Sequence, residues 1–142
     1  MKIKLKTKAK ATWSRMDREA VRAAAYFAAE LYGLPSYGTV IIKLCVHAGE
    51  DGSAVNLDDE TFMVFLTHQN IKEVLITLFH EMWHVRQYIY EDLSLEGTTS
   101  MFRKQEYDVD MGNCDFDTYW NLPWEVAARE AGDAMWEIYT NA

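Results

Sequence analysis

Two histidines and a glutamate at positions 80, 81 and 84 have the types and spacing of a metal-dependent hydrolytic site. His80 and His84 are four residues apart, so on a helix both side chains project from one face and both imidazoles can reach the same metal ion. Glu81 is turned away from that face, where its carboxylate can accept a proton from a metal-bound water without being a ligand. This H-E-x-x-H spacing is typical of zinc-dependent hydrolysis.

The segment around these residues predicts a central helix. Asn70 is a suitable N-cap and Glu73 can complete a capping box, so the helix is expected to begin after Asn70 and to end near Glu91 or Asp92. On the side opposite His80 the apolar positions are Ile71, Val74, Leu75, Leu78, Met82, Val85 and Ile89. Further apolar residues flank the histidines, which predicts a helix covered on most sides. Unpaired histidines in such a helix would be costly, so metal binding is favoured over solvated or core histidines.

The other patterns predict an α+β fold, with a small mixed or antiparallel sheet packed on the central helix and one domain spanning residues 1–142. The expected elements are strands at 2–10, 39–47 and 61–68, an N-terminal helix at 17–34 and a C-terminal helix from 123 to about 139. Lysines alternate along the first strand, which is typical of a protected sheet edge; the alternative is an arm that binds a polyanion. Residues 97–122 predict only a solvated acidic loop.

The charge and the cysteine content limit which partners and which cellular compartment are expected. The net charge of −8 over 142 residues speaks against nucleic acid as the main partner. The charge is uneven, because residues 1–22 contain eight basic and two acidic residues, whereas the rest contains six basic and twenty acidic ones. No segment predicts a membrane span or a targeting signal. The two cysteines form no C-x-x-C pair, so a reducing, cytoplasmic location is expected.

The residues themselves leave the third zinc ligand open. A catalytic zinc site needs three protein ligands and an exchangeable water. The extended metzincin motif is excluded, because Gln87 and Tyr90 stand where it has glycine and histidine. Outside the motif the only histidines are His47 and His68, both upstream of it. The remaining candidates are carboxylates of the C-terminal helix.

Two blocks of the sequence resemble the minimal gluzincin-type metallopeptidases, which are small H-E-x-x-H proteins of phages and bacteria. The first block is TLFHEMWHVRQY, residues 77–88. The second, residues 119–128, is similar to the family pattern Y-x-x-x-P-x-E-x-E-A and departs from it at Ala127, where the family has a second glutamate. Its matching positions are Tyr119, Pro123, Glu125 and Ala128. The resemblance covers roughly residues 61–140.

This resemblance implies a single zincin-like domain, a Zn²⁺ cofactor and a peptide or protein substrate. It carries Glu125 over as the third ligand, beside His80 and His84. In the mechanism that it implies, Glu81 takes a proton from the zinc-bound water and returns it to the leaving amine.

The position of Glu125 on the C-terminal helix agrees with this assignment. Glu125 shares a helix face with Ala128 and Gly132, and small residues there would allow a close approach to the metal-binding helix. Glu130 is the alternative ligand, but it lies well round the helix and is expected to be solvated. Arg129 could instead pair with Glu125 as a surface ion pair.

Further residues are candidates for supporting roles. Tyr119 is the first candidate for the donor that stabilises the oxyanion, with Tyr107 and His68 as alternatives. Gln87 lies on the ligand face one turn beyond the motif and is expected either to support a ligand or simply to pack. Residues 61–68 precede the metal-binding helix, as the substrate-binding edge strand of zincins does, so a peptide is expected to add to the sheet there.

The sequence therefore predicts a zinc metallopeptidase in which Glu81 is the general base. The alternative is a zincin-fold protein that binds zinc for regulation or interaction and cleaves nothing, although a purely structural site has no use for Glu81. A metal-free structural module is the third hypothesis, which metal content would separate from the other two. The oligomeric state and the preferred cleavage site do not follow from the sequence.

Overall fold

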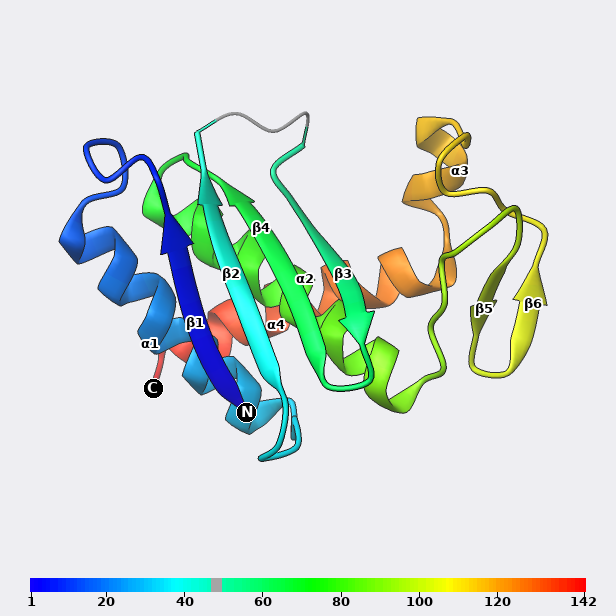
Figure 1. Cartoon of the computed structure of the whole chain (residues 1–142), viewed down its shortest axis with the longest axis horizontal. Helices are drawn as coiled ribbons and strands as arrows, with labels where there is room; N and C mark the ends of the chain where they lie inside the picture. Colours follow the sequence, from blue (N-terminus) through cyan, green and yellow to red (C-terminus); the bar gives the residue numbers. More distant parts are fainter. Residues whose placement is uncertain (47–49) are drawn as a thin grey trace.

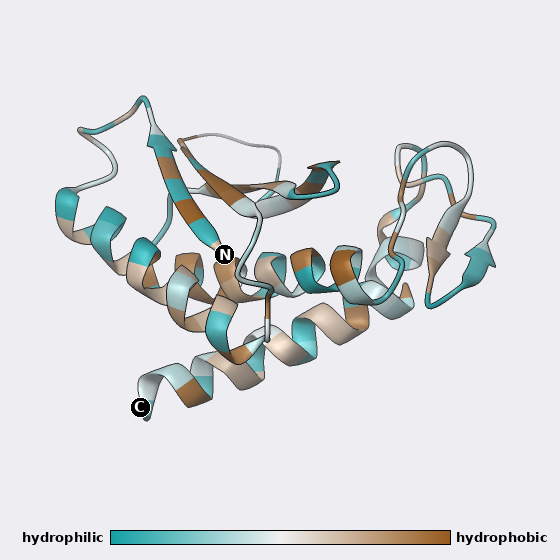
Figure 2. Ribbon diagram, turned by 60° about the horizontal axis from the view of Figure 1, so that its bottom comes forward, coloured by the Kyte–Doolittle hydropathy of each residue, from teal (hydrophilic) through white to brown (hydrophobic). Residues whose placement is uncertain are grey.

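A computed structural model describes residues 1–46 and 50–142 of the chain. In these residues the fold has three layers, namely a mixed sheet of four strands, a middle layer of two long helices, and a last helix on the outer side of that layer (Figures 1 and 2). The α+β class is thus confirmed. In chain order the elements are β1 (Lys2–Thr7), α1 (Arg15–Leu31), β2 (Thr39–Cys45), β3 (Gly52–Asp58), β4 (Thr61–Thr67), α2 (Ile71–Tyr90), β5 (Ser100–Phe102), β6 (Gln105–Tyr107), α3 (Phe116–Trp120) and α4 (Pro123–Thr140).

The strand order β1-β2-β4-β3 corrects one expectation about the sheet. Strands β1, β2 and β4 are parallel, and β3 pairs with β4 in the antiparallel direction. Strand β4 therefore lies inside the sheet, bonded to a strand on each side, and the expectation that residues 61–68 offer an edge to a peptide is wrong. The edge beside β4 is formed by β3, an element that the sequence pattern did not predict.

Strand β1 is an edge strand, as its lysine pattern predicted. Ile3 points into the core and is only 6% exposed, whereas Lys2, Lys4 and Lys6 are exposed. The alternation is visible as teal and brown bands along this strand in Figure 2. A row of lysines on an unpaired edge discourages nonspecific strand pairing.

Helix α2 is central because other elements cover it on two sides. The sheet lies over one side and α4 packs against the other (Figure 2). The helix begins where predicted, since the side chain of Asn70 accepts a hydrogen bond of 3.0 Å from the backbone N–H of Glu73. Its buried apolar residues are Val74, Leu75, Leu78, Phe79, Met82 and Val85. Of the apolar positions predicted for the core side of this helix, only Ile71 is exposed, at 39%.

The other predicted elements are confirmed with small shifts of their ends. Helix α1 begins at Arg15 because the side chain of Ser14 caps it, and it ends at Leu31 rather than at position 34. Helix α4 begins at Pro123, which is well suited to a first helical turn. Strands β2 and β4 stop at Cys45 and Thr67, slightly before the predicted ends. His47, one of the upstream histidines, lies outside the described residues.

The segment between α2 and α4 contains short elements that the sequence did not predict. Strands β5 and β6 form a hairpin, and the side chain of Asp115 caps α3 by accepting a bond of 2.7 Å from the Thr118 N–H. A second apolar cluster, formed by Leu93, Phe102, Leu122 and Trp124, anchors this region. This cluster fixes the start of α4, where Glu125 lies. None of the helices in the described ranges has the length and apolar character needed to cross a membrane.

Candidate metal centre

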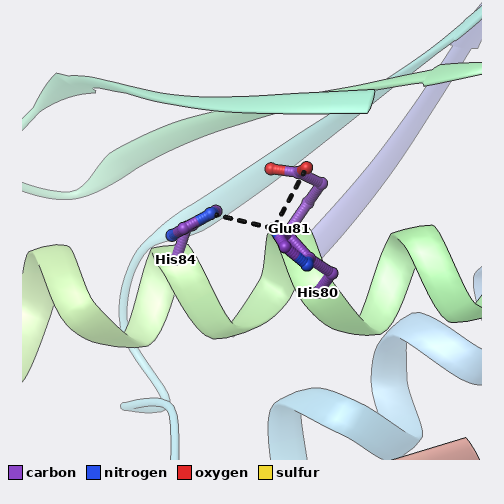
Figure 3. Close-up of side chains that lie close together, drawn as sticks. All are labelled: His80, Glu81 and His84. Atoms are coloured by element: carbon purple, nitrogen blue, oxygen red, sulfur yellow. Dashed lines mark hydrogen bonds and ion pairs between the residues drawn. The ribbon is translucent and has the colours of Figure 1, made fainter. Parts of the chain in front are cut away.

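His80 and His84 turn their rings toward the same point beside α2. Their Nε2 atoms are 3.2 Å apart and their ring centroids are 4.9 Å apart. Figure 3 shows the two side chains one turn apart on the helix, with a dashed line joining them. This is the geometry that the i, i+4 spacing predicted. Two neutral imidazole nitrogens so placed can bind one metal ion.

Glu125 reaches the same point from α4. Its Oε2 atom is 3.1 Å from Nε2 of His80, and its Oε1 atom is 3.2 Å from Nε2 of His84. The carboxylate is buried, since the residue is only 4% exposed. The structure therefore brings together the three side chains that the sequence analysis named as ligands.

The close approach of α4 to α2 depends on Gly132. A Cβ atom at this position would lie 3.2 Å from the backbone nitrogen of His80 and 3.3 Å from its Cα. Any larger residue would thus push the two helices apart at the level of the first histidine. The prediction that small residues on the face of Glu125 permit this approach is confirmed.

Glu125 stabilises the protonated form of His84, and the histidines stabilise the ionised form of Glu125. Burial alone would lower the pKa of His84, but the hydrogen bond to Glu125 and the charges of Glu81 and Glu125 outweigh it and raise this pKa to about 9. Burial would raise the pKa of Glu125, but its hydrogen bonds to the two histidines hold it far below the usual range. Glu125 therefore remains an anion with two imidazole partners, which is the state that a metal ligand requires.

Glu81 lies close to the ligands but is set apart from them. Its Oε1 atom is 4.0 Å from Nε2 of His80, a longer distance than either contact of Glu125. Glu81 also falls within a cluster of possible ligand atoms with the two histidines, all within 4.8 Å. The shorter distances favour Glu125 as the ligand and leave Glu81 free for another role. Figure 3 shows its side chain rising from α2 toward the overlying strands.

The surroundings of Glu81 affect its proton affinity. The residue is 5% exposed, and burial raises the pKa of its carboxyl group, although the nearby histidines lower it. The negative charges of Glu125 and Glu50 raise it further. A carboxylate whose pKa is raised in this way accepts a proton more readily, as a general base must.

Gln87 holds the ring of His84 in place. Its Oε1 atom is 2.7 Å from Nδ1 of His84, and its amide N–H donates to the backbone carbonyl of Trp124 at 3.0 Å. The carbonyl can only accept, so the amide orientation is fixed and Nδ1 of His84 is the nitrogen that carries the hydrogen. In the neutral form of His84, the Nε2 lone pair then faces the metal position. Of the two roles that the sequence left open for Gln87, the structure favours ligand support.

Tyr119 is the oxyanion candidate that lies at the site. Its side chain is half-buried, and burial together with the charges of Glu125 and Glu81 raises the pKa of its hydroxyl group. A side-chain interaction with Glu125 contributes to this rise of the pKa. A phenol with a raised pKa stays protonated and can donate to an oxyanion.

The two alternative donors pack elsewhere. The ring of Tyr107 lies against Trp124, with centroids 5.3 Å apart, in the apolar cluster under the β5–β6 hairpin. His68 packs edge-on against Trp13 and lies 3.8 Å from Asp17 of α1. The structure therefore places neither side chain in the group formed by the histidines and Glu125.

The alternative acidic ligand on α4 is exposed. Glu130 faces solvent, as predicted. Arg129 does not pair with Glu125 but lies over the ring of Trp120, with its guanidinium carbon 3.6 Å from the ring centroid. The surface ion pair considered for Glu125 is thus replaced by the contacts to the histidines.

Two features of the site were not predicted from the sequence. Gly52 of β3 lies directly on α2, because a Cβ there would be 2.6 Å from Cγ2 of Thr77 and 3.3 Å from Cγ of Glu81. Glu50, just before this strand, adds a third negative charge, which interacts with Glu81, Glu125 and Tyr119. A glycine next to a strand is a weak signal of close backbone approach, and nothing in the sequence points to Glu50.

The three contact distances match a zinc site. Atoms bound to a tetrahedral zinc at about 2.0–2.1 Å lie about 3.3–3.4 Å from one another. Here the two Nε2 atoms are 3.2 Å apart, and each contacts a different carboxylate oxygen of Glu125, at 3.1 Å for His80 and 3.2 Å for His84. A small rearrangement of the carboxylate would therefore bring one of its oxygens to a ligand position. The side chain of His80 is 18% exposed, against 8% for His84 and 6% for Glu125. The group is therefore most exposed at His80.

Comparisons with known proteins add neither a family nor a function to this description. No protein-family model matches the chain, and searches of curated proteins and of solved structures returned no match. The resemblance to gluzincins stays a prediction that rests on the sequence blocks described above.

Proposed function

We propose that the protein is a zinc-dependent metallopeptidase. The observation that carries this proposal is the convergence of His80, His84 and Glu125, in which the two Nε2 atoms are 3.2 Å apart and each lies 3.1 to 3.2 Å from one carboxylate oxygen of Glu125. Two imidazoles and one carboxylate are the donor set of a common class of catalytic zinc site. When bound, zinc would activate a water molecule for attack and polarise the substrate carbonyl.

Glu81 is the general base in this proposal. Its buried carboxylate lies beside the ligand group without belonging to it, and its pKa is raised. It takes a proton from the attacking water and transfers it to the leaving amine. Tyr119, whose hydroxyl remains protonated, donates a hydrogen bond to the oxygen that becomes negative.

Strand β3 supplies the surface on which a peptide would bind. One edge of β3 pairs with β4 and the other has no strand partner in the described residues. The start of the strand lies on Glu81, as the position of Gly52 demonstrates. A peptide in extended conformation can pair with such an edge through its backbone, which would lay its carbonyl groups across the site.

A cleavage assay with matched variants tests the proposal. The zinc-loaded protein is incubated with a peptide library and with casein, and products are identified by mass spectrometry. We expect cleavage by the wild type, at least a hundredfold slower cleavage by Glu81→Gln with its zinc retained, and unchanged cleavage by Glu130→Gln. Zinc binding without cleavage of any substrate would instead support the zinc-binding interaction protein.

A further inference from the structure

A basic cavity lies at the edge of the sheet opposite to β3. It has a volume of about 1070 Å³ and is bordered by β1, the segment that follows it, α1 and the end of β2. Seven lysine and arginine side chains line it, against one carboxylate, Glu19. The net charge of the lining is therefore +6 in a protein whose total charge is −8.

One wall of the cavity consists of arginines on α1. Arg15, Arg18 and Arg22 are three and four residues apart and so lie on one side of the helix. Arg15 pairs with Glu19 at 3.0 Å, where both side chains are exposed. Among the described residues no ion pair involves Arg18 or Arg22. Their guanidinium groups are available to a ligand.

The rest of the basic lining consists of lysines from the sheet and the segment after β1. Lys6 of β1 is in register with Lys43 of β2, so two like charges stand side by side. Such an arrangement is unfavourable unless an anion lies between or above the charges. Lys8 and Lys10 extend the row beyond the strand. The cavity contacts every residue from 5 to 10, so it follows the free edge of the strand.

The lining indicates what kind of anion fits. Arginine forks and lysines together bind phosphate groups. Phe65, which is half-buried, lines the same cavity, with the amine of Lys43 5.9 Å from its ring centroid. A cationic groove combined with an aromatic side chain is the arrangement that binds single strands through the phosphates and one stacked base. A concave surface does not suit a flat membrane, and an acidic peptide would leave the aromatic ring without a stacking partner.

We propose that this basic cavity binds single-stranded nucleic acid through its phosphate backbone, without sequence preference. The proposal departs from the expectation drawn from the total charge. Charges farther away than about 8–10 Å are screened at physiological salt, so the local surplus of cations decides binding. Because β1 and β3 are opposite edges of the sheet, the proposal does not depend on the peptidase function.

Fluorescence anisotropy with a labelled oligothymidylate of about 20 nucleotides tests the proposal. The cavity variants are Arg18→Gln/Arg22→Gln, on α1, and Lys6→Gln/Lys43→Gln, on the sheet. The matched control is Lys72→Gln/Lys104→Gln, which removes the same charge outside the cavity. We expect each cavity variant to bind about tenfold or more weakly and the slope of log K against log salt to fall by about 1.4. The control is expected to bind within twofold of the wild type.

Competing anions and a folding check complete the test. Unchanged circular dichroism and thermal unfolding of the variants would show that the substituted side chains act on the ligand rather than on the fold. Absence of binding to the oligonucleotide at low salt would overturn the proposal, as would equal weakening by the cavity and control variants. Tighter binding of a labelled oligoglutamate or of anionic phospholipid vesicles would also overturn it, in favour of an acidic peptide or a membrane.

Discussion

Gln87 and His84 form a buried pair in which the amide oxygen lies 2.7 Å from Nδ1 of the imidazole. The amide group is itself held by the carbonyl of Trp124, at the start of the helix that carries Glu125. One side chain therefore orients a ligand on α2 and joins α2 to the first turn of α4. The pair links the two helices that form the candidate metal centre.

Replacing Gln87 should weaken metal binding. In Gln87→Leu the size of the side chain is nearly kept, but His84 loses its acceptor, so we expect zinc affinity to fall by about 10–100-fold. The carbonyl of Trp124 also loses its donor, at a cost of about 1–3 kcal/mol in the free energy of unfolding. Gln87→Glu keeps an acceptor for His84 and should lose less affinity. Competition with a chromogenic chelator and urea unfolding measure both effects, and equal zinc affinity of Gln87→Leu and wild type would refute the role.

Gly132→Ala should be destabilising, although alanine normally stabilises a helix. In an exposed helix the change from glycine to alanine gains up to about 1 kcal/mol. Here the new methyl group would lie 3.2 to 3.4 Å from the backbone and Cβ of His80, so we expect a loss of about 1–3 kcal/mol and weaker zinc binding. Ala134 is an exposed residue of the same helix, so Ala134→Gly is the control and should leave zinc affinity unchanged. A more stable Gly132→Ala protein would show that the helices are not in close contact there.

The contact between Gly52 and Thr77 can be tested by compensation. Gly52→Ala places a methyl group 2.6 Å from Cγ2 of Thr77 and should displace β3 from Glu81, lowering stability by about 1–3 kcal/mol. Thr77→Ser removes that Cγ2 atom. We expect the double variant to recover part of the stability, with a coupling energy above about 0.5 kcal/mol in a double-mutant cycle. Additive effects of the two substitutions would mean that β3 does not rest on α2 at this point.

Zinc affinity should increase with pH. In protein stripped of metal, the pKa of His84 is about 9, above its ordinary value of 6.5, so zinc must displace a proton at neutral pH. Affinity is expected to rise about tenfold per pH unit from about pH 7 toward pH 9, above which His84 no longer contributes. The stability of the metal-free protein should change in the opposite direction with pH. The part of it that is due to protonated His84 is complete below pH 6.5 and is lost as the pH rises through about 9. Chelator competition over this range measures the first trend, and affinity independent of pH would contradict it.

The parts of the fold that the sequence predicted are those with strong local signals. Helix α2 combines a capping residue, Asn70, with a long apolar pattern, and β1 combines lysines with an alternating apolar face. Strand β3 was missed because only β4 and α2 give it a place to pack, while its own residues, Ser53 to Asp58, are mostly polar or small. The position of β4 inside the sheet could not be predicted without β3.

The same reasoning applies to the candidate site. The spacing of the histidines follows from the helical period alone, whereas Glu125 could be named only from the resemblance of residues 119–128 to the gluzincin pattern. The contact of Gln87 with Trp124 spans 37 residues, and such long-range contacts leave no periodic signal. Short elements such as α3, which has five residues, are below the length at which periodicity is informative.

Zinc stoichiometry is the measurement that tests the central claim most directly. Elemental analysis of the wild type and of Glu125→Ala and Glu130→Ala, after reconstitution and removal of free metal, compares a proposed ligand with an exposed glutamate of the same helix. We expect one zinc per chain in the wild type and in Glu130→Ala, and a large loss of zinc in Glu125→Ala. A wild type that retains no zinc, or equal zinc contents in the two variants, would contradict the assignment of His80, His84 and Glu125 as a metal centre.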